Sequence, residues 1–172
     1  MFSINSTIEL LERTPNALYH LLNAVSEKWI SQNEGEDTWT PFDVVGHLIH
    51  CEQTNWIPRI QIILSGKENR SFEPMDMSAQ FTNSKGKTIN DLLFEFQTLR
   101  KINVERLKTL KLTEEDFNKT ATHPSLGKVT LEQLISTWLV HDLDHMNQIS
   151  RVMAKQYKTE VGPWIKYLKI LK

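Results

Sequence analysis

The strongest constraint on the fold is a helical pattern that runs from Thr130 to about Tyr157. Thr130, followed three residues later by Gln133, is the signature of a capping box and marks the start of a helix. Apolar residues then recur at helical spacing until Gly162 and Pro163, which stop any continuation. A long helix with one apolar face needs other helices to cover that face.

A second helix is expected from Thr40 to Ser65, in the stretch TPFDVVGHLIHCEQTNWIPRIQIILS. We expect Thr40 to be its N-cap and Pro41 its first helical residue, with Asp43 supplying an acidic first turn. Pro58 lies well inside the pattern and should kink or interrupt the helix, because proline has no N–H to donate.

Two further helical segments complete the set. Residues 5–29 form the first, with a break at Thr14 and Pro15, where Thr14 should recap the chain. Residues 89–110 form the other, which opens with Thr88 as N-cap. Four long helices in one layered unit predict an all-α protein, a four-helix bundle.

The connections between these helices carry no pattern that we would assign to a strand. Residues 67–86 lack periodicity and are expected to form a long loop between the second and third helices, and residues 164–171 a short amphipathic tail. At 172 residues the chain is expected to form a single domain, 1–172.

Composition excludes several classes of function. The net charge of −1 provides no basic field for nucleic acid, and no apolar run approaches the ~18 residues of a membrane span. The single cysteine, Cys51, rules out an internal disulfide framework. The N-terminal sequence is amphipathic and does not resemble a secretion signal, so we expect a cytoplasmic protein with neither nucleic acid nor membrane as a partner.

Two histidines fall within the apolar stripe of the last long helix. His141 and His145 are four residues apart and therefore lie about 40° apart around the helix axis. Buried imidazoles need hydrogen-bond partners or a metal ion. An i, i+4 pair can bind one ion, but the same spacing is also found in pairs of hydrogen-bonded core histidines.

A third ligand is expected from the second helix, where His47 borders the inner face. Three neutral imidazoles would leave coordination positions open, as in catalytic sites for zinc, nickel, iron or cobalt. His50 should turn outward, and Cys51 is either an ordinary core residue or a soft group near the ion. Of the other histidines, His20 is interpreted as a surface residue, while His123 is expected either to anchor its loop or to lie at the rim of the site.

Two acidic residues are candidates for orienting the histidines. Asp142 and Glu52 could accept hydrogen bonds from imidazole N–H groups. The alternative for each is a solvated charge on a helix surface. Asp144, which points away from the apolar stripe, is expected to face water.

The residues around these histidines resemble a known family. The stretches WTPFDVVGHLIHCE, HPSLGKVTLEQLISTWLVHDLDHMNQISRVMA and VGPWIKYLKIL are similar to those of the DinB/YfiT-like superfamily of bacterial four-helix-bundle metalloenzymes. The similarity covers nearly the whole chain. It implies that His47, His141 and His145 bind a divalent metal. We expect zinc or nickel ahead of iron or manganese.

The resemblance also implies a range of activities. Relatives include enzymes that transfer low-molecular-weight thiols such as bacillithiol to electrophiles, and homodimers are common among them. We therefore expect a metal-dependent S-transferase or hydrolase that acts on a small molecule. The alternative is a non-catalytic, metal-stabilised stress or binding protein. Asn55, Trp138 and Gln148 are candidates for lining the pocket, although each could equally be a packed or solvated side chain.

Overall fold

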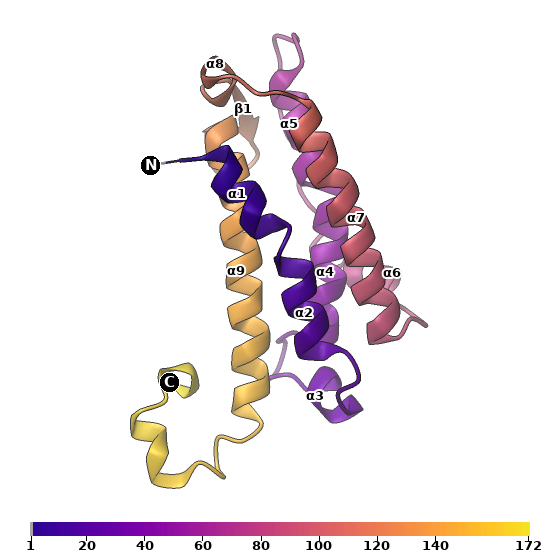
Figure 1. Ribbon diagram of the computed structural model, residues 1–172, viewed down its shortest axis with the longest axis vertical. Coiled ribbons are helices and arrows are strands. Elements are labelled where there is room, and N and C mark those ends of the chain that lie inside the picture. The colour runs from indigo at the N-terminus through magenta and orange to yellow at the C-terminus, as the bar shows by residue number, and fades with distance from the viewer. Residues whose placement is uncertain (1) are drawn as a thin grey trace.

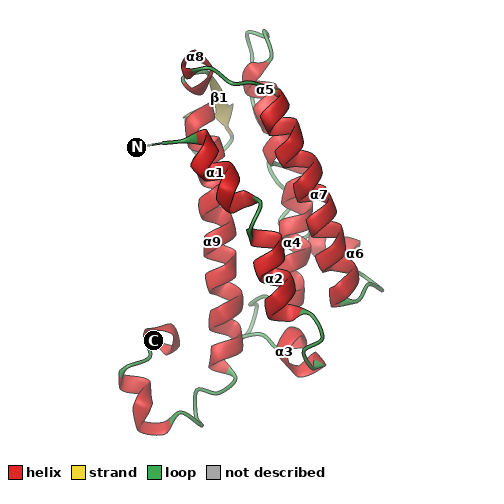
Figure 2. Ribbon diagram, in the orientation of Figure 1, coloured by secondary structure: helices red, strands yellow, loops and turns green. Residues whose placement is uncertain are grey.

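Four helical rods lie side by side along the long axis of the molecule and form a four-helix bundle (Figures 1 and 2). The computed structural model describes residues 2–172. The rods are α1 (Ile4–Leu11) with α2 (Thr14–Leu22), α4 (Pro41–Thr54) with α5 (Trp56–Leu64), α7 (Ile89–Thr109), and α9 (Leu131–Lys155). Within residues 2–172, no helix has both the length and the apolar character needed to cross a bilayer.

Capping boxes start three of the four rods; the sequence predicts the box at Thr130 and N-caps at Thr40 and Thr88. The side chains of Thr40, Thr88 and Thr130 each accept a hydrogen bond from the backbone N–H three residues on. The side chains at those third positions bond back to the backbone N–H of the threonine, so donors at the helix start are satisfied in pairs. These three helix starts are confirmed.

Two prolines divide the first and second rods, and the interruption expected from Pro58 is present. The first rod breaks between Leu11 and Thr14, and Arg13 rather than Thr14 occupies the N-cap. The second rod breaks at Asn55, three residues before Pro58. A proline ring clashes with the carbonyl four residues earlier, which here belongs to Thr54, so the disruption appears one turn before the proline itself.

Short elements fill the connections. They are α3 (Glu27–Ser31), α6 (Ala79–Asn83), α8 (Glu114–Phe117), and the 3₁₀ turns η1 (Gly162–Lys166) and η2 (Lys169–Leu171). The expectation of a loop throughout residues 67–86 is therefore corrected, because α6 packs against α4 with Gln80 fully buried. The C-terminal tail turns back toward α9 after η1 (Figure 1).

The expectation that the chain has no strands is wrong. β1 (Thr120–His123) and β2 (Gly127–Thr130) form an antiparallel hairpin in which Ala121 is opposite Val129. Gly127 has a φ of +70°, a conformation that glycine adopts without strain and that suits the end of a short hairpin loop. β2 leads directly into α9, so the hairpin fixes where the longest helix begins.

The apolar core consists of two clusters separated by a polar layer at mid-height. One cluster packs near α5 and the first turns of α9, around Trp56 and Trp138, while the other packs around Leu48 and Phe96. Along α7 and α9 the buried polar residues fall between the residues of the two clusters, whereas on α4 they are interspersed with apolar residues of both. They are His47, His50, Glu52, Arg100, Asn103, Asp142 and His145.

Arg100 is the centre of this polar layer and is 1% exposed. Its guanidinium donates to Glu52 Oε1 at 2.8 and 3.0 Å and to both oxygens of Asp142 at 2.5 and 2.9 Å. The fifth N–H donates to the carbonyl of Leu11 at 3.0 Å. Pro15, four residues after Leu11, has no N–H to offer that carbonyl. The Arg100 cluster, defined as Arg100 with Glu52, Asp142 and the Leu11 carbonyl, therefore joins all four rods.

Arg100→Met should destabilise the protein by about 3–5 kcal/mol, because two buried carboxylates lose the cation that compensates them. Urea unfolding followed by far-ultraviolet circular dichroism measures the difference. The matched control is Arg106→Met on the same helix, where the side chain is exposed and the change should stay within about 0.5 kcal/mol.

If Arg100→Met does not fold, a second variant tests the same claim. Adding Glu52→Gln and Asp142→Asn removes the uncompensated charges and should recover part of the lost stability. Equal free energies of unfolding for Arg100→Met and Arg106→Met would contradict the role given to the Arg100 cluster.

Candidate metal centre

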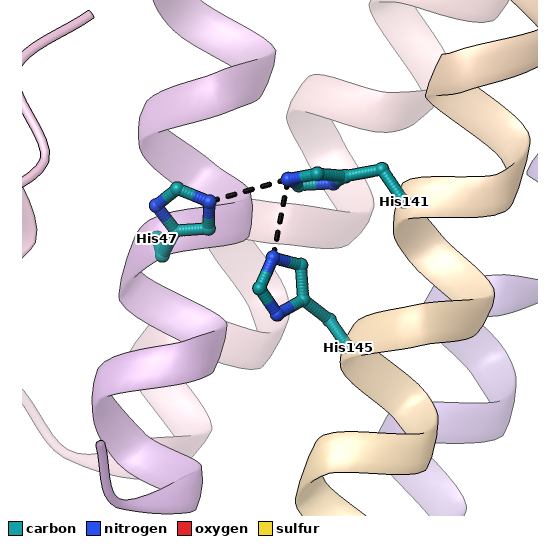
Figure 3. A group of neighbouring side chains, drawn as sticks. All are labelled: His47, His141 and His145. Carbon is teal, nitrogen blue, oxygen red and sulfur yellow. Dashed lines mark hydrogen bonds between the residues drawn. The ribbon is translucent and has the colours of Figure 1, made fainter. Parts of the chain in front are cut away.

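Three imidazole rings from two helices converge in the polar layer (Figure 3). His47 Nε2 lies 3.2 Å from His141 Nε2, which in turn lies 3.1 Å from His145 Nε2. Tetrahedral bonds of about 2.0–2.1 Å to one ion would place nitrogens about 3.3 Å apart. The spacing of the three nitrogens therefore fits a single ion, and we call these residues the histidine triad.

One member of the histidine triad is held by a hydrogen bond from its far nitrogen. His145 Nδ1 lies 2.7 Å from Gln148 Oε1, and an amide oxygen can only accept, so Nδ1 carries the proton and Nε2 presents a lone pair. Fixing the tautomer in this way is typical of histidines that bind metals. Gln148, a candidate for lining the pocket, thus contacts the triad. His47 Nδ1 and His141 Nδ1 are buried and have no partner among the described residues.

Burial keeps the triad in the form that binds cations. It lowers the pKa of His47 to about 4, with neighbouring His145 and His50 adding to the effect. Burial likewise lowers the pKa of His141 to about 3, reinforced by the two other triad histidines and by Arg100. The pKa of His145 is also lowered by burial, which Gln148 and two aspartates oppose. All three rings are neutral at pH 7, which is the state in which imidazole can bind a metal.

The two acidic candidates accept no hydrogen bond from an imidazole of the described residues. Glu52 and Asp142 are 2% and 0% exposed, and both bond to Arg100 rather than to an imidazole. The alternative of solvated helix charges is also wrong for both. The bond between Asp142 and Arg100 fixes the rotation of α9 about its own axis. Because Asp142 directly follows His141, this rotation sets the direction in which the α9 histidines point. Asp144 is exposed, as expected.

Cys51 lies against the histidine triad. Its Sγ is 3.4 Å from His47 Nε2 and 3.9 Å from His141 Nε2. Burial and, to a smaller extent, the nearby carboxylates of Glu52 and Asp142 together raise the pKa of this thiol to about 12, so the free group is protonated. His50, expected to turn outward, is only 8% exposed and lies beside Thr54.

Tryptophans enclose the histidine triad on two sides. The ring of Trp39, in the loop before α4, lies 4.8 Å from that of His47, and Trp56 meets His141 edge-on at 5.1 Å. Trp138, a candidate for lining the pocket, is fully buried; it stacks on Trp56 at 5.7 Å and donates its Nε1–H to Glu52. Its role is therefore packing behind the pocket wall.

A cavity of about 380 Å³ reaches the histidine triad at His141. It lies between α5, the loop of residues 72–77, the hairpin and the start of α9, and most of its lining is apolar. Asn55 lines this cavity, as expected, and its Oδ1 is buried without a partner among the described residues. His123 combines both roles expected of it, because it lines the cavity while its Nδ1 accepts two backbone N–H groups of its own loop.

Three features of the site were not expected from the sequence: the hairpin wall, Trp56 and Arg59. The hairpin signal is present in the turn residues before Gly127, but each strand is only four residues long. Arg59 could have been found by extending the i, i+4 series of His47, Cys51 and Asn55 by one more step along the same face.

The chain belongs to the DinB superfamily, whose family model matches residues 10–149. A protein from Bacillus cereus strain AH820, named "Putative metal-dependent hydrolase", is 27% identical over 154 residues, covering 88% of this chain and 86% of that protein. A relative of the same name in Bacillus anthracis strain A0248 matches with the same identity and coverage.

A solved structure has the same fold. It is described as "YfiT from Bacillus subtilis is a probable metal-dependent hydrolase with an unusual four-helix bundle topology". The TM-score is 0.76 at 22% sequence identity, and the match covers 91% of this chain and 90% of that one. The family membership and the bundle expected from the sequence are thus confirmed.

The loop that carries Trp39 is tied to α9 by an ion pair, which predicts a dependence of stability on pH. Glu34 accepts hydrogen bonds from Arg151 at 2.6–3.1 Å and pairs with Lys155 at 2.7 Å. The bond from Arg151 lowers the pKa of Glu34 from 4.5 to about 2, although burial opposes it. Because the folded-state pKa is depressed, this stabilisation is present above about pH 4.5 and is lost as the pH falls toward 2.

Glu34→Gln should therefore lower the free energy of unfolding by about 1 kcal/mol at pH 7, given the exposure of the two cations. The difference from wild type should shrink between pH 5 and pH 3, as measured by urea unfolding at each pH. Glu36→Gln, in the same loop and exposed, is the control. A difference that stays constant over this pH range would contradict the ion-pair explanation.

Proposed function

We propose that this protein is a metal-dependent hydrolase in which the histidine triad binds a divalent ion. The observation that carries the proposal is the convergence of three neutral Nε2 atoms, at 3.1 and 3.2 Å, beside a cavity. The names of the Bacillus relatives support hydrolysis as the reaction class.

The donor set suits an open catalytic site. Three protein ligands leave at least one further position for a reactant, whereas structural zinc sites usually have four. Imidazole suits zinc, nickel and iron, whereas manganese prefers oxygen ligands, so zinc and nickel are the first ions to test, followed by iron and manganese. A divalent ion held there would polarise the bond under attack and lower the pKa of a water ligand toward neutrality.

The chain itself supplies the surroundings of the reaction. Trp39 and Trp56 limit the access of bulk water to the histidine triad, and the cavity at His141 offers an apolar path for a small-molecule substrate. Gln148 keeps His145 in the tautomer that binds a cation. Asn55 presents a buried, unpaired acceptor in the cavity, which suits a substrate with an N–H or O–H donor.

Two alternative functions predict a different product or none. In the first, the nucleophile is a low-molecular-weight thiol of the bacillithiol type; this activity comes from the family resemblance, and the relatives' names give it no support. In the second, the protein binds metal without catalysis. Metal would then raise stability, since an ion that binds only the folded state stabilises it by mass action, but no turnover would follow.

We expect zinc- or nickel-loaded protein to hydrolyse members of a panel of apolar esters and amides. His141→Ala should lower the rate at least about 100-fold, because it removes a ligand and opens the triad. Initial rates by chromatography measure the loss, and mass spectrometry in ¹⁸O-water identifies the nucleophile.

Asn147→Ala is the matched control, since this exposed residue lies on the same helix two residues after His145. Its rate should equal that of wild type. Unchanged turnover in His141→Ala would refute catalysis at the triad. A product that contains the added thiol instead of ¹⁸O would indicate S-transfer, and a metal-dependent rise in Tm without turnover of any substrate would indicate the binding protein.

A further inference from the structure

The cavity beside the histidine triad carries one positive charge and no negative one. Its lining includes Arg59 from α5 and His123 from the hairpin, but no aspartate or glutamate. α5 and the hairpin lie near the same end of the bundle and contact each other (Figure 1). A bound anion would compensate the charge of a cation in a cavity that is otherwise mostly apolar.

Phe72 organises the cationic end of the cavity. This ring is 4% exposed, and its backbone is fixed by a hydrogen bond from Phe72 N to the carbonyl of Thr122 in β1 at 2.9 Å. The guanidinium of Arg59 lies over the ring at 4.9 Å, and the ring of His123 meets it edge-on at 6.2 Å. The two polar side chains therefore share one rigid aromatic support, which pre-organises them for a common ligand.

Arg59 has no carboxylate partner among residues 2–172. Its hydrogen bond goes to the backbone carbonyl of Glu73 at 3.1 Å, and no acidic oxygen forms an ion pair with it. Glu73 and Asp76 line an adjacent groove with Arg59, yet Asp76 accepts from Ser78 instead. Arg100 and Arg151, which are also at least partly buried, bind carboxylates, whereas the partly buried Arg70 donates to the carbonyl of Ile63 and does not line the cavity. The fork of Arg59 thus keeps donors for a ligand.

His123 supplies a second donor. Its Nδ1 accepts from the backbone N–H groups of Ser125 at 3.1 Å and Leu126 at 3.3 Å, so the neutral ring carries its proton on Nε2. Burial and the charge of Arg59 lower the pKa of His123, which favours this neutral form at pH 7. The cationic end of the cavity therefore offers one full positive charge together with a neutral donor.

We propose that the cavity binds the substrate by a carboxylate, which Arg59 and His123 hold at the end of the cavity formed by Phe72, while the apolar body of the substrate packs against Met75, Leu126 and Leu134. This deepens the proposed function and rests on it: the substrate is an apolar ester or amide that bears a carboxylate remote from the bond that is cleaved. A single cation matches a monoanion, whereas a phosphate dianion would remain partly uncompensated in so apolar a cavity.

The probe pair is 4-phenylbutyrate and 4-phenylbutanamide, which share size and shape and differ in charge. Binding is measured by calorimetry and by intrinsic tryptophan fluorescence, to which Trp56 in the cavity lining contributes. The protein is metal-free, so that a carboxylate cannot bind an ion instead. We expect the acid to bind at least about tenfold more tightly than the amide. Arg59→Gln should weaken the acid about 10- to 100-fold and the amide less than about twofold.

Arg59→Lys, which retains the charge, should recover part of the preference, and Arg106→Gln, at an exposed arginine on α7, should leave it intact. Equal affinity for acid and amide in wild type, or equal weakening of both by Arg59→Gln, would overturn the proposal. If phenyl phosphate binds more tightly than the acid, and Arg59→Gln abolishes that binding, the anionic group that the site recognises is a phosphate and the carboxylate proposal is wrong. If metal-free protein prefers the acid to the amide but metal-loaded protein hydrolyses nothing, the anion site is supported and the hydrolase proposal is refuted. If the protein hydrolyses substrates but does not prefer the acid, the hydrolase proposal is supported and the anion site is refuted.

Discussion

The hydrogen bonds of the Arg100 guanidinium are the interaction on which the rest of the structure depends. One side chain contacts α1 through a backbone carbonyl, α4 through Glu52 and α9 through Asp142, while belonging to α7. Every N–H of the guanidinium is used. A rotation or a one-turn slide of the rods that carry Glu52, Arg100 or Asp142 would therefore leave a buried charge without a partner, and a shift of the first rod would leave a buried N–H unpaired. Two apolar clusters above and below the polar layer supply most of the burial, but apolar packing alone tolerates such shifts more readily.

The same cluster determines where the histidines point. Asp142 follows His141 by one residue, and Glu52 follows His47 by five, so fixing the two acids against α7 turns the imidazoles of α4 and α9 toward each other. Replacing a buried ion cluster by apolar residues often stabilises a protein, so stability alone does not explain its presence. Here it gives rotational register to the helices that carry the histidine triad.

Much of this arrangement follows from local sequence signals. Capping threonines at three helix starts, the i, i+4 pair of His141 and His145, and the inner position of His47 are periodic or local, and the structure brings the three rings together. The partners of Glu52 and Asp142 could not be found in this way, because Arg100 lies more than forty residues from either acid. The hairpin and the Phe72 support of Arg59 were missed for a related reason, since each depends on contacts between short segments that have no periodicity of their own.

The central claim is that the histidine triad binds a divalent ion, and elemental analysis of protein purified without a metal-affinity tag tests it most directly. The account predicts about one divalent ion per chain in wild type, and loss of that ion when His47, His141 and His145 are all replaced by alanine in a variant that remains folded. Metal well below one ion per chain, at a level unchanged in the triple variant, would contradict it.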